Sequence, residues 1–170
     1  IEDTSYIPVL VELRMVNSME INEISLYDII FHNLINNGFR MEDKYFEYSL
    51  EEGGYVILLD GFDEINREKI QKVTEEIINI SGKYPKNKYI LTSRPTDSFM
   101  GWNDYIEMNA LELTKKQALS LISKIDFDEQ VKKTFYKELD EKLYDKYKSF
   151  ASNPLLLTIM LLTFDNHASI

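Results

Sequence analysis

Three carboxylates follow a short apolar run in the chain, at a spacing that suits phosphoryl-transfer chemistry. Residues 55–59 are continuously apolar, and Asp60, Gly61, Asp63 and Glu64 follow. A buried strand can hold a carboxylate rigidly at its C-terminal end, where open α/β sheets bind their ligands. Proteins hold Mg²⁺ through one or two carboxylates, while water and substrate phosphates complete its octahedron. We therefore predict that Asp60 binds a magnesium ion.

The residues after Asp60 suit the handling of water and phosphate. Gly61 has no side chain to obstruct their approach, and either Asp63 or Glu64 would orient the attacking water. In isolation, the same residues also fit an acidic turn after a buried strand. An EF-hand calcium loop is excluded, because Phe62 stands where that loop needs an oxygen ligand.

A second apolar run ends in polar side chains of a different kind. Thr92, Ser93 and Arg94 follow residues 89–91. On a strand next to the first, this pattern would place Thr92 or Ser93 near a γ-phosphate and Arg94 on its developing charge. Alone, the pattern is more typical of a strand end with a surface arginine. Its position after the acidic motif, at α/β spacing, favours the functional interpretation.

Strand-like and helix-like patterns alternate around these motifs. Apolar runs predict strands at 6–13, 55–59, 89–91 and 105–108. Helical spacing and end signals predict helices at about 26–36, 42–51 and 70–82, the first of them after a capping box of Ser25 and Asp28. The first run is typical of a strand covered on both faces, as in parallel sheets. The first part of the chain is therefore expected to be an α/β layered fold.

The last third of the chain shows helical patterns only. We place the boundary between residues 109 and 110, giving domains 1–109 and 110–170. Thr114 and Gln117 form a capping box, and a charged helix starts near Asp128. Pro154 is expected to begin a final helix that Asn153 caps. The side chains expected to pack inward from it are Leu155, Leu156, Ile159 and Leu162.

Composition narrows the possible partners. The chain has 170 residues, of which 19 are basic and 29 acidic, for a net charge of −10. The lysines are mixed with acids, so direct binding to nucleic acid is disfavoured. The longest apolar run is too short to cross a membrane. The chain has no cysteine, which fits a reducing compartment, so we expect a cytoplasmic protein.

Several segments together resemble the NACHT family of STAND P-loop NTPases. Residues 55–65 (YVILLDGFDEI) resemble its extended Walker B motif, and residues 91–95 (LTSRP) resemble its sensor 1. Residues 152–157 (SNPLLL) resemble the helical-domain segment whose proline contacts adenine. Residues 7–14 (IPVLVELR) resemble the strand between the phosphate-binding loop and Walker B. The likeness covers nearly the whole chain.

The resemblance implies a fold, a ligand and a role for each matching residue. The fold would be an incomplete P-loop NTPase three-layer sandwich followed by a small helical domain. Asp60 would bind Mg²⁺, Asp63 or Glu64 would act on water, Thr92 and Arg94 would meet the γ-phosphate, and Pro154 would touch the base. In this family, ATP or ADP sets an open or closed state that controls self-oligomerisation, and hydrolysis is slow. Its members include innate-immune receptors and bacterial defence proteins.

One departure from the family's pattern matters most. A phosphate-binding loop needs G-x-x-x-x-G-K followed by Ser or Thr, whereas the one Gly-Lys pair here, Gly82-Lys83, precedes Tyr84. We interpret that pair as a helix C-cap. Because the chain begins with Ile1, we expect a fragment of a longer parent protein that supplies the loop, and we expect the fragment itself to be inactive. The strand at 89–91 would then pair with residues 105–108 or with a second copy.

Two alternatives stay open. The chain would equally suit a degenerate NACHT-like interaction module that never binds nucleotide. A related AAA-type or helicase ATPase is a further alternative, which the acidic charge and the Ser-Arg-Pro sequence disfavour. Arg14 would either fold back on a carboxylate or face a nucleotide, and we favour the structural role.

Overall fold

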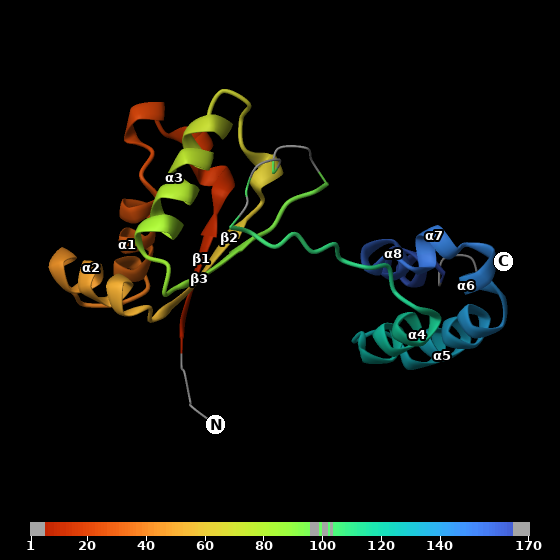
Figure 1. Ribbon diagram of the computed structural model, residues 1–170. Coiled ribbons are helices and arrows are strands. Elements are labelled where there is room, and N and C mark those ends of the chain that lie inside the picture. The colour runs from red at the N-terminus through yellow and green to blue at the C-terminus, as the bar shows by residue number, and fades with distance from the viewer. Residues whose placement is uncertain (1–5, 96–98, 100–101, 103, 165–170) are drawn as a thin grey trace. The chain divides into compact units, whose positions relative to one another are not determined.

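The computed structural model describes residues 6–95, 99, 102 and 104–164, and the chain divides into two compact units (Figure 1). The first unit is Ile1–Trp102 and the second is Asn103–Ile170. The division falls a few residues before the boundary expected between 109 and 110.

A parallel three-stranded sheet forms the centre of the first unit. Its strands are β1 (Ile7–Glu12), β2 (Tyr55–Asp60) and β3 (Lys88–Leu91), in the order β1-β2-β3. The register places Glu12 beside Asp60 and Leu59 beside Leu91. The carboxyl ends of the strands therefore meet at the same end of the sheet. The expectation of an α/β fold with a parallel sheet is confirmed.

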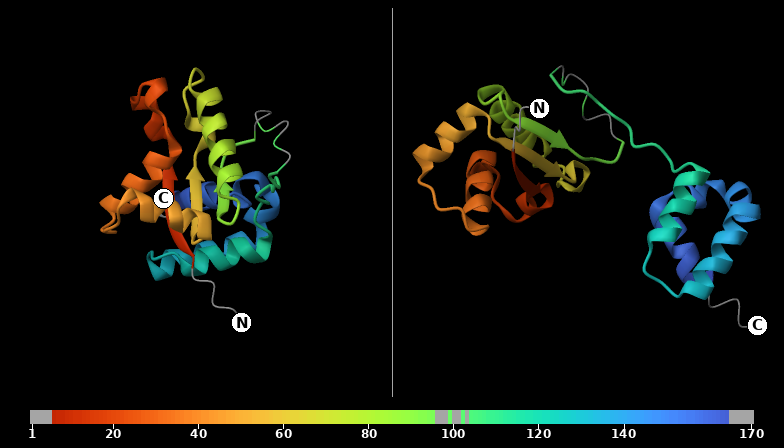
Figure 2. Two further views of the ribbon diagram at one scale, coloured as in Figure 1. Left: turned by 60° about the vertical axis from the view of Figure 1, so that its left-hand side comes forward. Right: turned by 90° about the horizontal axis from the view of Figure 1, so that it is seen from below.

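The helices of this unit lie on one face of the sheet (Figures 1 and 2). They are α1 (Leu26–Asn36), α2 (Asp43–Glu52) and α3 (Ile70–Lys83). Chains that add parallel strands in one direction, with crossovers of one hand, place their connecting helices on one side. The side chains buried between these helices and the sheet include Val9, Val11, Ile30, Leu34, Phe46, Tyr55, Ile57, Leu59, Val73 and Ile77.

The opposite face of the sheet stays apolar but is not covered by the described residues. Leu10 and Ile90 are 52% and 51% exposed, Pro8 is exposed, and Val56 and Leu58 are half-buried. The expectation that the first strand is covered on both faces is therefore wrong for this part of the chain. An apolar run shows which faces are apolar, but covering both faces also needs elements on both sides.

Local signals at the helix ends are borne out in several places. Ser25 caps α1 by accepting the N–H of Asp28 at 3.3 Å, and Gly38 follows the helix at φ 92°. Gly82 is different, because it lies inside α3, whose C-cap is Tyr84. The interpretation of Gly82-Lys83 as a C-cap was wrong, since the helix runs through both residues.

The fourth predicted strand does not form. Residues 105–108 have no strand conformation, and no strand among the described residues pairs with the outer edge of β3. Ile106, Met108 and Leu111 are 88%, 86% and 91% exposed. Apolar alternation predicts a strand only when a neighbouring strand supplies hydrogen-bond partners, and none of the described strands pairs with this segment.

The second unit consists of helices. They are α4 (Lys115–Lys124), α5 (Glu129–Glu138), a π-helical turn at Leu139–Leu143, α6 (Tyr144–Lys146), α7 (Lys148–Ala151) and α8 (Pro154–Phe164). The capping box of Thr114 and Gln117 is present, and Asp128 caps α5. Asn153 accepts the N–H groups of Leu155 and Leu156 at 3.0 and 3.1 Å. The predicted start of the last helix is confirmed.

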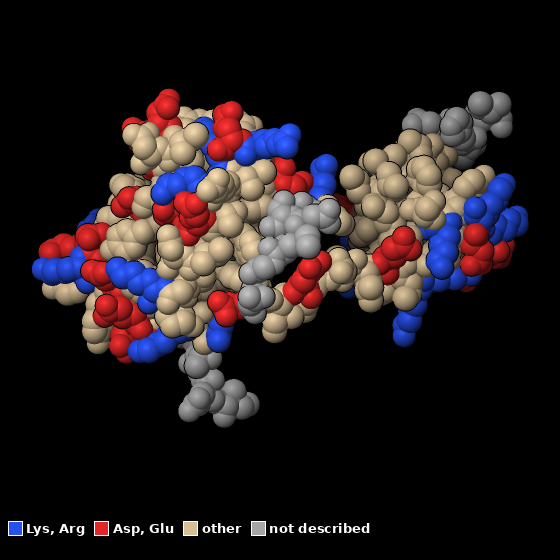
Figure 3. Space-filling view, turned by 45° about the horizontal axis from the view of Figure 1, so that its top comes forward, with Lys and Arg blue, Asp and Glu red and all other residues tan. Residues whose placement is uncertain are grey.

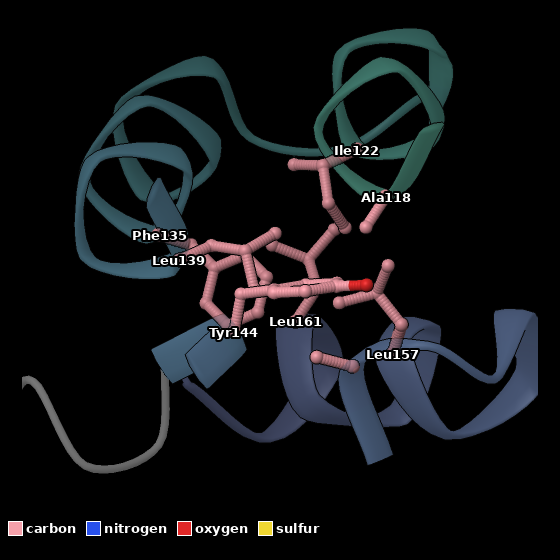
Figure 4. Close-up of a cluster of buried hydrophobic side chains, with 8 residues drawn as sticks. Ala118, Ile122, Phe135, Leu139, Tyr144, Leu157 and Leu161 are labelled. Atoms are coloured by element: carbon pink, nitrogen blue, oxygen red, sulfur yellow. The ribbon is translucent and has the colours of Figure 1, made fainter. Parts of the chain in front are cut away.

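The core of the second unit corrects the predicted face of α8. Leu157 and Leu161 are fully buried and point into the cluster shown in Figure 4, whereas Leu155, Ile159 and Leu162 are 69%, 45% and 48% exposed. Because α8 is apolar nearly all round, spacing alone does not indicate which stripe faces the core. Among the described residues, none of the helices combines the length and the apolar character needed to cross a bilayer.

Two glycines allow a matched test of the first unit. Gly53 ends α2 at φ 85°, and a Cβ added there would lie 2.8 Å from the carbonyl oxygen of Lys86. Gly53→Ala should lower the free energy of unfolding by at least about 1–2 kcal/mol, because an L residue is strained at this φ. Gly82→Ala, at a helical position with nothing within 4 Å, should raise it by about 0.5–1 kcal/mol. Urea unfolding curves measure both changes, and equal midpoints for the two variants would contradict this account.

Candidate functional site

The carboxyl ends of β1 and β2 bring two acids together. Glu12 and Asp60 are the last residues of their strands, they are neighbours in the register, and both are exposed. Gly61 follows Asp60 at φ 77°, and the 3₁₀ turn Phe62–Glu64 comes next. A Cβ on Gly61 would lie 3.3 Å from Cδ of Glu64. Glycine is therefore favoured here by the backbone conformation, and a Cβ would also press on the Glu64 side chain.

Thr92 joins residues 60–64, here called the acidic loop, to the end of β3. Its N–H donates to the carbonyl oxygen of Leu59, and its own carbonyl accepts the N–H of Phe62, both at 2.9 Å. Its hydroxyl accepts the N–H of Gly61 at 3.0 Å and donates to Oδ1 of Asp60 at 2.5 Å. The two sequence motifs, with Asp60 and Thr92 32 residues apart, are therefore directly bonded.

Asp63 makes a second link between the same two segments. Its Oδ1 accepts the backbone N–H of Arg94 at 3.0 Å, and its Oδ2 lies 3.4 Å from Nε of the same arginine. The Asp63 side chain is 23% exposed, whereas that of Arg94 is 86% exposed. Both carboxylate oxygens of Asp63 are thus engaged with Arg94, while most of the guanidinium stays open to solvent.

Glu64 faces a different way, toward the ends of β1 and β2. A cavity of about 170 Å³ is lined by Glu12, Arg14, Asp60 and Glu64. Nε and Nη2 of Arg14 donate to Oε2 of Glu12 at 3.0 and 2.7 Å, so this arginine folds back on a carboxylate as favoured from the sequence. The hydrogen bond that Arg14 donates to Glu12 and the negative charges of Glu12 and Glu64 raise the pKa of Arg14. The cavity is therefore a concentration of negative charge around one cation.

Phe62 of the acidic loop packs in an aromatic cluster. Phe62 is 1% exposed, and its ring centroid lies 5.1 Å from that of Phe99 and 5.8 Å from that of Trp102. Trp102 is the one tryptophan of the chain. Its fluorescence is therefore a natural reporter of events in the loop that carries Asp60 and Glu64.

Sequence reasoning missed two residues of this site, Glu12 and Asn17. Glu12 ends β1 as Asp60 ends β2, so a carboxylate at the end of a strand was the available signal. Asn17 donates from Nδ2 to the carbonyl oxygen of Glu64 at 2.9 Å and accepts the N–H of Asn66 on Oδ1 at 2.8 Å. No local pattern marks a contact of this kind, because it joins segments more than 40 residues apart.

Pro154 belongs to the second unit. It is the first residue of α8, and it is exposed. Its contact with a nucleotide base stays a prediction.

The acidic end of the sheet fits the donor set of a magnesium ion bound with a nucleotide. Among the described residues, no group of three or more His, Asp or Glu side chains is arranged to hold a metal by itself. Mg²⁺ needs only one or two carboxylates when phosphates and water supply its other ligands. Four carboxylates lie at this end of the sheet beside only two arginines, so a cation is favoured here electrostatically. The carboxylates are those of Glu12, Asp60, Asp63 and Glu64.

The described residues do not include a phosphate-binding loop. Gly82 and Lys83 lie within α3 and not on a loop before a helix. Figure 3 shows Lys and Arg mixed with Asp and Glu on the face that it draws, without a continuous basic stripe there. A search against protein-family models and a search of curated proteins find no match to the chain.

Thr92 offers a test of the link between the two motifs. Thr92→Val removes the hydroxyl at nearly constant shape, leaving the N–H of Gly61 without its acceptor. It should lower the free energy of unfolding by about 0.5–1.5 kcal/mol and speed hydrogen exchange at the amide of Gly61. Thr92→Ser keeps the hydroxyl and should leave that exchange rate nearly unchanged. Equal exchange rates in the two variants would show that the hydroxyl does not hold the loop.

Proposed function

We propose that this chain is part of a NACHT-type STAND NTPase, a nucleotide-dependent signalling switch whose parent protein binds ATP and Mg²⁺. The observation that carries the proposal is the direct bonding of the two motifs at the carboxyl ends of parallel strands. Thr92 bonds to Asp60, and Arg94 bonds to Asp63. Open α/β sheets bind ligands at this end, so the two motifs meet where a ligand would be expected.

Asp60 is the proposed holder of Mg²⁺, either directly or through water. When bound, the ion would neutralise charge on the phosphates of the nucleotide. Asp60 is supported for this role by its exposed position at the end of β2 and by the hydroxyl of Thr92, which orients its carboxylate. Thr92 and Arg94 are proposed to meet the γ-phosphate, and the exposure of the guanidinium of Arg94 is consistent with reaching an anion.

Glu64 is the proposed general base. Both oxygens of Asp63 are occupied by Arg94, whereas the carboxylate of Glu64 lies in the cavity beside Asp60. In the proposed reaction, Glu64 accepts a proton as water attacks the γ-phosphorus, and the bond from that phosphorus to the β–γ bridging oxygen breaks. The products are ADP and inorganic phosphate. Asp63 would position Arg94 and would not act on water.

The parent protein would have to supply the phosphate-binding loop, since the described residues have none. Pro154 is proposed to contact the base. As in the family that the chain resembles, the bound nucleotide would control self-oligomerisation of a defence or regulatory protein, and turnover would be slow.

A second candidate function is an interaction module that never binds nucleotide. The uncovered apolar face of the sheet around Leu10, Leu58 and Ile90 favours it, because large apolar patches are common at protein interfaces. ATP binding by the parent protein separates the two candidates.

The isolated chain should not bind ATP specifically, because it lacks the backbone cradle that surrounds phosphates. Titration calorimetry with Mg-ATP should give no saturable heat, and the emission of Trp102 should not change during the titration. A micromolar dissociation constant would contradict the expectation. Added ADP tests the same point without hydrolysis.

In the parent protein, removing either proposed carboxylate should abolish most turnover. Glu64→Gln should lower kcat by about 10²-fold or more, because general-base catalysis typically contributes about 10²–10⁴-fold. Asp60→Asn should also lower kcat strongly, because it removes the charge that would hold Mg²⁺. Glu51→Gln is the matched control, since Glu51 lies on α2, before β2, at the opposite end of the sheet. Phosphate release measures the rates. Unchanged turnover in both site variants would exclude these assignments.

A further inference from the structure

The backbone of Glu64 is held from outside its own loop by Asn17. This asparagine lies in the 3₁₀ helix Leu13–Ser18, which directly follows β1. Its amide nitrogen donates to the carbonyl oxygen of Glu64 at 2.9 Å, and its amide oxygen accepts the N–H of Asn66 at 2.8 Å. One side chain therefore satisfies two backbone groups flanking Ile65, as a neighbouring strand would.

The turn that carries Asn17 is itself fixed by a buried lysine. Lys69 is 7% exposed, and its Nζ donates to the carbonyl oxygens of Val16, Asn17 and Met19 at 3.0, 2.8 and 2.5 Å. These acceptors use all three N–H groups of the ammonium, which makes burial of the charge tolerable. Lys69 lies between the acidic loop and α3. Asn17 therefore bonds to the segment after β2, and Lys69 of that segment bonds back to the turn that carries Asn17.

Thr92 and Arg94 anchor the loop at residues 60–63, and Asn17 anchors it at Glu64 and Asn66. The N–H of Glu64 donates to Gly61 within the 3₁₀ turn, and that of Ile65 donates to Phe62 at 3.3 Å. These bonds shape the turn but do not fix it against β1. The bonds to Asn17 connect it to the segment that also carries Arg14, which lines the cavity with Glu64.

We infer that Asn17 is a positioning residue for Glu64. It holds the Glu64 backbone so that the carboxylate enters the cavity beside Asp60, and it does so without touching substrate. The inference rests on the proposed NTPase function, because it assigns Asn17 a part in the reaction of Glu64. A displacement of about 1 Å at a catalytic group can reduce the rate by about 10²-fold, so loss of this contact should affect turnover more than binding.

Turnover by the parent protein tests the role. Asn17→Ala should lower kcat by about 10–100-fold while changing KM for ATP by less than about threefold. Ser18→Ala is the control, since its hydroxyl donates to Met15 within the same turn and does not contact the acidic loop. In a Glu64→Gln background, Asn17→Ala should cause no further loss, because it acts through Glu64. If Asn17 had only a general structural role, Asn17→Ala would lower kcat by the same factor in the wild-type parent and in the Glu64→Gln variant. That result would overturn the inference.

Amide hydrogen exchange on the 170-residue chain tests the contact without any activity. Asn17→Ala should remove protection at the N–H of Asn66, while Asn17→Asp should largely keep it, because one carboxylate oxygen can replace the acceptor. Unchanged exchange in Asn17→Ala would overturn the contact. A wild-type parent without ATP turnover would instead refute the proposed function, whereas an active parent with unchanged kcat in Asn17→Ala would refute only the role of Asn17.

Discussion

The hydrogen bonds of Thr92 hold the site together. Its backbone extends the pairing of β2 with β3 beyond Leu91, and its hydroxyl spans from the N–H of Gly61 to the carboxylate of Asp60. The acidic loop is therefore positioned by the sheet and not by its own short turn. The link from Asp63 to Arg94 and the packing of Phe62 in the aromatic cluster both follow from that placement.

The sequence predicted which residues would meet, but not how they would divide their roles. Parallel strands place their carboxyl ends together, so the proximity of Asp60 and Thr92 followed from two apolar runs and their polar ends. Asp63 and Glu64 are adjacent and chemically alike, and only the path of the 3₁₀ turn turns one toward Arg94 and the other toward Glu12. Contacts across the turns after β1 and β2 depend on tertiary structure, and no local pattern reports them.

The fold was predictable where a signal is local and failed where it depends on neighbours. The caps at Ser25, Thr114 and Asn153 each use a side chain and a backbone N–H a few residues away, and all three form. The strand expected at 105–108 needed a partner strand, and none of the described residues provides one. The inward face of α8 could not be deduced from spacing, because apolar residues surround that helix. The apolar face around Leu10 shows the same limit, since apolar character does not indicate what will cover it.

In the proposed function, the carboxylate at the end of β2 serves a bound magnesium nucleotide. A crystal structure of the parent protein with Mg²⁺ and a non-hydrolysable ATP analogue tests it most directly. We expect the metal at Asp60, either coordinated directly at about 2.1 Å or through a single water, with the γ-phosphate near Thr92 and Arg94. It also predicts the Glu64 carboxylate on the side of the attacking water. A nucleotide bound elsewhere, with Asp60 contacting neither metal nor its water, would contradict the account.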